Sequence, residues 1–148
     1  MIKKDSSKVT GMLNIVVRDD AGKIKDEYTV PNLVVDTGLA FIASRMKDTT
    51  DAAMSHMAVG TDTTAANAAD TQLGTQLGSR QALTSTTVNS NSITYVATFA
   101  AGSGTGALTE AGIFNASSSG TMLCRTVFSV INKGAADSMT VTWTVTIS

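Results

Sequence analysis

The residues that could carry chemistry are few and lie far apart along the chain. His56 is the only histidine and Cys124 the only cysteine, which excludes a zinc site built from several such side chains. A catalytic triad would have to use His56, yet no sharp strand-to-helix turn bearing a serine lies beside it. We therefore expect no enzymatic activity, no cofactor and no metal site, and interpret His56 as a partly exposed residue at a strand edge.

Three further features have structural interpretations. Cys124 alternates with apolar neighbours, and a free cysteine on a buried face usually behaves as a small hydrophobe. The segment GSGTG at 102–106 lacks the lysine of a phosphate-binding loop and precedes no helix pattern, so it indicates a connection between strands. Glu110 lies inside a strand-like segment, and we expect it to make a structural hydrogen bond to backbone or to a hydroxyl.

The composition favours a single β-rich domain. The 148 residues carry a net charge of −1, only 16% are charged, and Ser and Thr supply roughly a quarter of the chain. Nucleic acid is disfavoured as a partner because phosphate binding needs a concentrated basic face. No apolar run is long enough for a membrane span, and the first residues lack the apolar core of a secretory signal. We expect the protein to be made in a cytoplasm.

The clearest element is the closing strand. Met139–Ile147 reads MTVTWTVTI, with apolar residues at every odd position and threonine between them. A period of two predicts a strand with one buried face. Val141, Trp143 and Val145 are expected on that face and in the core.

A hairpin is predicted near the start of the chain. Val9–Arg18 and Lys23–Val30 are rich in apolar and β-branched residues, and Asp19–Gly22 supplies turn residues between them. Pro31 is expected to end the second strand, since proline cannot donate to a strand ladder. The aspartates of the turn lack the further carboxylates that a calcium loop would need.

One helix is predicted, at about Gly38–Met46. Leu39, Ile42 and Met46 fall at helical spacing and are expected to form the face that enters the core. The closing Trp143 should then pack against this face or against an opposed sheet. A helix this short suits a plug on one end or face of a sheet.

The rest of the chain reads as short strands separated by loops. Thr61–Gly78 has little periodicity and is predicted to be a long surface loop. Phe128, with Met122 and Cys124, is expected on one face of a late strand, and Leu123, Arg125 and Val127 on the other. Further strands are predicted at Met57–Val59, Arg80–Val88, Ser92–Ala100, Thr109–Asn115 and Thr121–Ile131. The pattern predicts a mainly β, antiparallel sandwich or barrel-like domain over 9–148 with one short α-helix.

The first eight residues, Met1–Lys8, are polar and carry no periodic pattern. A disordered tail is one interpretation. The other, which we prefer, is an N-terminal arm that contacts a neighbouring subunit, where Lys3, Lys4 and Lys8 would pair with acidic groups.

Three segments together support a resemblance to known proteins. They are NLVVDTGLAFIASRM at 32–46, MAVGTDTTAANAADTQLG at 57–74 and LTEAGIFNASSSGTMLCRTVFSV at 108–130. With the closing Thr-Val strand, they resemble small virion structural proteins of tailed bacteriophages. The TEAGIF segment is also similar to parts of phage tail-fibre and baseplate proteins. The resemblance covers most of the chain beyond about residue 10.

The resemblance implies assembly rather than catalysis. It leads us to expect a virion component and homo-oligomer that contacts capsid, neck or tail proteins, as a capsid decoration or cement protein or a neck-collar subunit. A tail-fibre or baseplate adaptor is the alternative. A carbohydrate-binding surface module is a third interpretation, which the low aromatic content of 5% disfavours.

Overall fold

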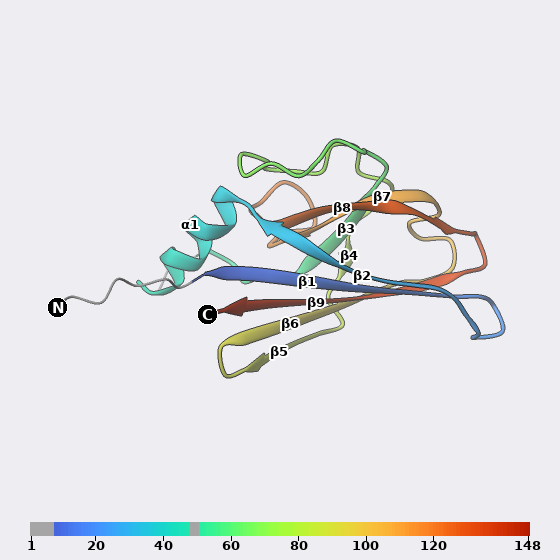
Figure 1. Ribbon diagram of the computed structural model, residues 1–148, viewed down its shortest axis with the longest axis horizontal. Coiled ribbons are helices and arrows are strands. Elements are labelled where there is room, and N and C mark those ends of the chain that lie inside the picture. The colour runs from blue at the N-terminus through green and yellow to red at the C-terminus, as the bar shows by residue number, and fades with distance from the viewer. Residues whose placement is uncertain (1–7, 48–50) are drawn as a thin grey trace.

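The computed structural model describes residues 8–47 and 51–148, which form nine antiparallel strands and one short helix (Figure 1). The strands are β1 (Val9–Arg18), β2 (Ile24–Val34), β3 (His56–Gly60), β4 (Gln81–Ala82), β5 (Ser85–Asn89), β6 (Ser92–Phe99), β7 (Gly106–Phe114), β8 (Met122–Lys133) and β9 (Ser138–Ile147). The helix α1 (Asp36–Arg45) follows β2. The prediction of a mainly β, antiparallel, barrel-like domain is confirmed.

The strands form a single sheet that curls into a half-barrel. Their order is β4-β3-β7-β8-β2-β1-β9-β6-β5, so consecutive strands β4 and β5 lie at opposite edges. Leu83 and Thr84 connect them. The Leu83 N–H donates to the Ser55 carbonyl beside β3, and the Thr84 N–H donates to the Val96 carbonyl of β6. The predicted strand Arg80–Val88 is therefore two strands. The two residues between them, Leu83 and Thr84, hydrogen-bond to segments near opposite edges of the sheet.

The closing strand β9 lies between β1 and β6, and it has the one buried face that its alternating pattern predicts. Trp143 is opposite Leu13 on one side and Tyr95 on the other. Trp143 is fully buried, and Val141, Val145 and Phe128 are buried with it. The apolar residues at alternate positions of β9 thus face the inside of the half-barrel, and the threonines between them face outward.

The helix presents a different face to the core from the one predicted. Gly38 and Phe41 face inward and Ile42 packs at the margin, whereas Leu39 is exposed and Met46 is 90% exposed. The prediction that Leu39 and Met46 belong to the core is wrong. The reason is a close approach of helix and sheet, because a Cβ at position 38 would collide with the Leu123 carbonyl. Only glycine allows this contact, and it sets the buried face.

Pro31 does not end its strand. It lies inside β2 opposite Met12, and its carbonyl accepts a hydrogen bond from the Thr126 hydroxyl. The pairing of β2 with β8 begins only at Leu33, which is opposite Arg125. The missing N–H of Pro31 is therefore not needed for that ladder, and β2 can pass from β1 to β8.

Candidate functional site

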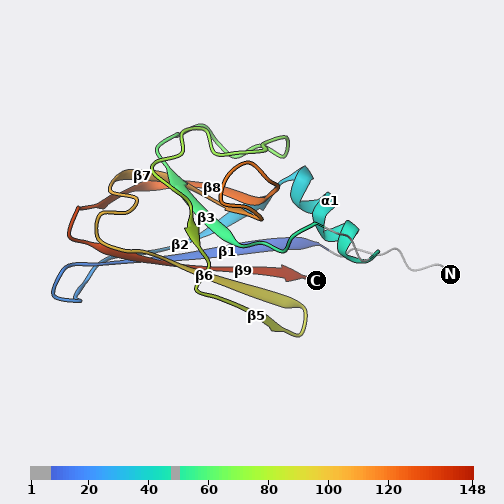
Figure 2. The same ribbon diagram turned by 180° about the vertical axis from the view of Figure 1, so that it is seen from behind.

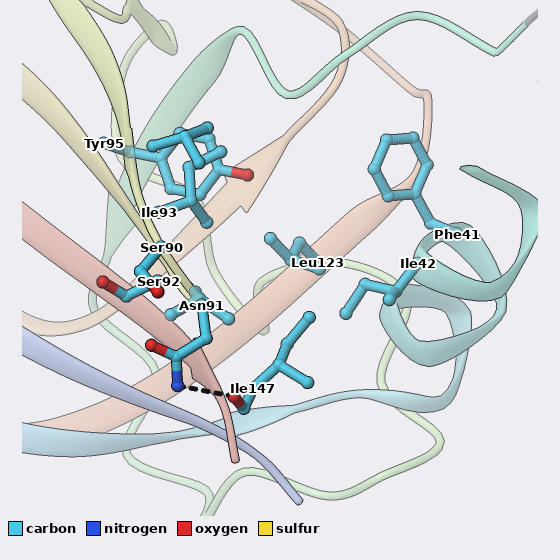
Figure 3. Close-up of a pocket in the computed structure, with 11 residues that line it drawn as sticks. Phe41, Ile42, Ser90, Asn91, Ser92, Ile93, Tyr95, Leu123 and Ile147 are labelled. Atoms are coloured by element: carbon cyan, nitrogen blue, oxygen red, sulfur yellow. Dashed lines mark hydrogen bonds between the residues drawn. The ribbon is translucent and has the colours of Figure 1, made fainter. Parts of the chain in front are cut away.

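An apolar groove lies between α1 and the β5–β6 hairpin (Figure 3). Its volume is about 180 Å³. We call this surface the helix groove. Its lining is Phe41, Ile42, Val88, Ser90, Asn91, Ser92, Ile93, Tyr95, Leu123, Val145 and Ile147. A second hollow of about 250 Å³ shares Phe41, Ile42, Ile93 and Tyr95 and continues the groove toward Arg45, Met54 and Thr86.

The sheet and the helix each supply one wall. Ile93 is opposite Val145 across the β6–β9 ladder, so both side chains point to the concave face of the sheet. Phe41 comes from the inward face of α1. The Asn91 side-chain amide donates to the Ile147 carbonyl at 2.8 Å, which fastens the hairpin turn to the end of β9 (Figure 3). The two walls of the groove are thus formed by the helix and by the sheet, and the Asn91–Ile147 hydrogen bond links the hairpin turn to the end of β9.

Tyr95 is the ionisable group at the base of the groove. Burial raises its pKa to about 12, with a smaller contribution from the nearby Cys124 thiol. The phenol therefore stays neutral at physiological pH, and the groove offers a mainly apolar lining with neutral polar groups and no charged side chain.

Apolar side chains surround the groove on the outside of the molecule. Val88 and Ile147, which line it, are 70% and 48% exposed, and Leu39 of α1 and Met46, which directly follows α1, are exposed as well. An apolar patch that a protein leaves in water and frames with polar residues commonly marks a contact with another protein. Leu39 and Met46, wrongly assigned to the core, lie three and four residues along the chain from the groove residue Ile42, so we include them in the candidate interaction surface.

A second region has the opposite character. Arg125 of β8 and Glu110 of β7 are both buried, and the guanidinium donates to Glu110 Oε2 from Nε at 3.1 Å and from Nη2 at 2.9 Å. Its Nη1 donates to Asp70 at 2.8 Å and its Nη2 to Asp62 at 3.2 Å. We call these four side chains the arginine cluster. Burial opposes the charge on Arg125, but the hydrogen bonds with Glu110 and Asp70 outweigh it and raise its pKa.

The arginine cluster fastens the long loop 61–78 to the sheet. The Glu110 carboxylate accepts the backbone N–H groups of Asp62, Gly74 and Thr75 at 3.2, 2.9 and 2.7 Å. The expected hydrogen bond from Glu110 to backbone is thus confirmed. Sequence reasoning missed Arg125 as its partner. The signal available in the sequence was one acidic and one basic residue inside two predicted strands that follow one another along the chain, Thr109–Asn115 and Thr121–Ile131.

The other predicted site residues do not line the groove. Cys124 is buried, as predicted, and burial raises the pKa of its thiol to about 12. His56 begins β3, with its Nδ1 2.8 Å from the Ser55 hydroxyl. Lys8 is exposed, and its backbone N–H and carbonyl both pair with Ser148. Lys3 and Lys4 lie outside the described residues, as does most of the predicted arm.

Two kinds of feature are absent from the described part of the chain. In residues 8–47 and 51–148, no group of three or more His, Cys, Asp or Glu side chains is arranged to hold a metal ion. In the same residues no helix has both the length and the apolar character needed to cross a membrane.

Comparisons with known proteins add no relative: no protein-family model, curated protein or solved structure matches this chain.

Proposed function

We propose that this protein is a structural component of a tailed-phage virion, and that it stabilises the particle by protein–protein contacts as a capsid decoration or cement protein, or as a neck-collar subunit. The observation that carries the proposal is the helix groove with its exposed apolar rim. The resemblance of segments 32–46, 57–74 and 108–130 to small phage virion proteins supports the same class.

The dimensions of the helix groove suit a side chain from a neighbouring protein. An engineered protein cavity of about 150 Å³ accepts a benzene-sized group, so a groove of about 180 Å³ has room for one leucine or phenylalanine. Buried aromatic or aliphatic anchors of this kind carry much of the energy in protein interfaces. The low charge of the chain, 16% of residues, also limits the desolvation cost of burying its surface.

A tail-fibre or baseplate adaptor is the alternative, and it rests on the TEAGIF similarity. In the structure this segment belongs to β7, where Glu110 joins the arginine cluster and the apolar side chains are buried. The similarity therefore concerns internal packing more than an exposed contact. Copy number distinguishes the decoration or cement role from the others: a shell protein would be present in hundreds of copies per particle, and a neck or tail protein in about six to a few dozen, given symmetric rings.

The experiment compares two matched aspartate substitutions in particles assembled from the full chain. Ile147→Asp places a charge at the rim of the helix groove, and Ile24→Asp places one at the β1–β2 turn, at the opposite end of the molecule (Figure 1). The two isoleucines are equally exposed, at 48% and 47%, so both variants should fold. Incorporation into purified virions should fall for Ile147→Asp and stay unchanged for Ile24→Asp. Full incorporation of both variants would contradict the proposal.

A further inference from the structure

The two edges of the sheet are protected to different degrees. β4 at one edge is only two residues long, and Arg80 beside it donates to the Ala116 and Ser119 carbonyls. β5 at the other edge has five residues, all exposed. Within the described residues no strand pairs with the outer side of β5, and both views place it at the margin of the molecule (Figures 1 and 2).

The sequence of β5 lacks the usual devices that block an exposed edge. Proteins prevent unwanted edge pairing with charged residues, proline, a bulge or a very short strand. β5 reads Ser-Thr-Thr-Val-Asn, with no charge and no proline, and its five residues pair with β6 in unbroken register. Its side chains are mainly small or β-branched, which favours extended backbone. Such an edge accepts another strand readily.

The register shows which groups of β5 are available. Thr86 and Val88 are opposite Tyr95 and Ile93, so they share the concave face with the helix groove, and Thr87 lies on the other face. The two-residue turn that follows makes Asn89 and Ser92 a hydrogen-bonded pair. Hydrogen-bonded pairs alternate, so the backbone groups of Thr86 and Val88 point away from β6.

We propose that β5 is a self-association edge, which pairs antiparallel with β5 of a second copy of this chain about a two-fold axis at Thr87. The axis places Thr87 opposite its own counterpart and Thr86 opposite Val88 of the second copy. The sheet then continues across two subunits, and the second copy's Val88 extends the apolar wall that Thr86 begins. Two-fold contacts of this kind use the same patch on both partners.

A second copy fits this edge better than a charged peptide. The two strands of such a pair would be uncharged and equal in length, so neither brings an unpaired charge to the contact. The pairs of Thr86 with Val88 would also join β-branched residues across the strands. The inference stands apart from the proposed virion role, because it concerns the purified protein alone.

The test uses opposite charges at the two-fold position. Sedimentation equilibrium of the full chain over a range of concentrations should show a monomer–dimer equilibrium. Thr87→Asp and Thr87→Lys each place like charges opposite one another and should weaken dimerisation by roughly fivefold or more. An equimolar mixture of the two variants should restore dimers to at least the wild-type level. Thr10→Asp, on an exposed residue of the interior strand β1, is the control and should leave dimerisation unchanged.

Three results would overturn the inference. Wild-type protein that stays monomeric at millimolar concentration would exclude self-association. Dimers that are insensitive to both Thr87 substitutions, or that do not return on mixing, would place the contact elsewhere.

Circular dichroism melting curves for each variant distinguish lost association from lost folding. Thr86→Pro gives a second check, because it removes an outward N–H and should abolish dimers while keeping the fold.

Discussion

The arginine cluster and the helix groove lie on the same curled sheet but are completed in opposite ways. At the arginine cluster, loop 61–78 covers the sheet and brings two carboxylates and three backbone N–H groups to Arg125 and Glu110. At the helix groove, α1 covers only part of the concave face and leaves Val88 and Ile147 in water. The polar groups of the arginine cluster are thus paired within the chain, whereas the apolar rim of the helix groove stays exposed.

The difference has an energetic basis. A buried arginine is tolerated only when hydrogen bonds and opposite charges surround it, so the arginine cluster must be complete within one subunit. Exposed apolar side chains carry no such requirement, and their burial in a contact is favourable by about 25 cal/mol per Å². Substitutions in the arginine cluster are therefore expected to change mainly the stability of the protein, and substitutions at the helix groove mainly its binding to other proteins.

The largest effect should come from breaking the arginine cluster. Arg125→Met removes the cation and leaves Glu110 buried without its charged partner, which should lower the free energy of unfolding by about 3–5 kcal/mol. Urea denaturation followed by tryptophan fluorescence measures the change. Lys23→Met, at an exposed turn, is the control and should stay within about 0.5 kcal/mol of wild type. A similar value for both variants would show that the cluster does not hold the loop.

An intermediate effect is expected where the helix meets the sheet. Gly38→Ala adds a Cβ that collides with the Leu123 carbonyl and must push α1 away from β8, at a cost of roughly 1–3 kcal/mol. Since Phe41 moves with the helix, the groove should widen as stability falls. Thermal unfolding and the crystal structure of the variant measure the two changes. A variant as stable as wild type would mean that the helix position is not set by Gly38.

The contribution of each region to stability should also depend on pH, with the loss at acid pH for the arginine cluster and at alkaline pH for the helix groove. The backbone hydrogen bond from Thr64, helped by Arg125, holds the pKa of Asp62 below its usual value, although partial removal from water acts in the opposite direction. A lowered pKa means that the stabilisation is present above the unfolded-state pKa of about 3.9 and is lost as pH falls through the folded-state value. Tyr95 is the reverse: its stabilisation is present below about pH 10 and is lost as pH rises toward its folded pKa of about 12.

Urea titrations at several pH values test this contrast. Asp62→Asn should reduce the acid-dependent loss of stability and leave the alkaline loss intact, and Tyr95→Phe should do the reverse. Identical pH profiles for wild type and both variants would contradict the roles of Asp62 and Tyr95 in the pH dependence of stability.

The smallest effect on stability is expected at the rim of the groove. Leu39→Ser and Met46→Ser replace exposed side chains and should change the free energy of unfolding by less than about 0.5 kcal/mol. Their effect should appear instead in incorporation into virions, which should fall. A loss of several kcal/mol would show that these residues pack against the core after all.

Much of the fold could be predicted because the strands follow local rules. The alternation in Met139–Ile147 predicts the buried face of β9, and the turn residues after Val9–Arg18 predict the first hairpin. The predicted bounds of the helix agree with α1 to within two residues, but the predicted buried face is wrong. Helical spacing identifies Leu39, Ile42 and Met46 as a stripe, whereas a non-local contact at Gly38 decides which stripe faces the sheet.

The candidate site was less predictable, for the same reason. The helix groove joins residues from α1, the β5–β6 hairpin and the end of β9, which only the curl of the sheet brings together. The arginine cluster depends on the offset between β7 and β8, where Arg125 is opposite Gly112 and reaches Glu110 diagonally. Alternation gives the face of a residue but not the register of its neighbour strand.

The density of this chain in an intact particle, determined by electron cryomicroscopy at side-chain resolution, tests the proposed role directly. We expect a neighbouring chain to cover the helix groove and to insert an apolar side chain between Phe41 and Ile147. We also expect loop 61–78 of the same subunit to close the arginine cluster. A groove that faces solvent in every copy, or a virion without this chain, would contradict the proposed role.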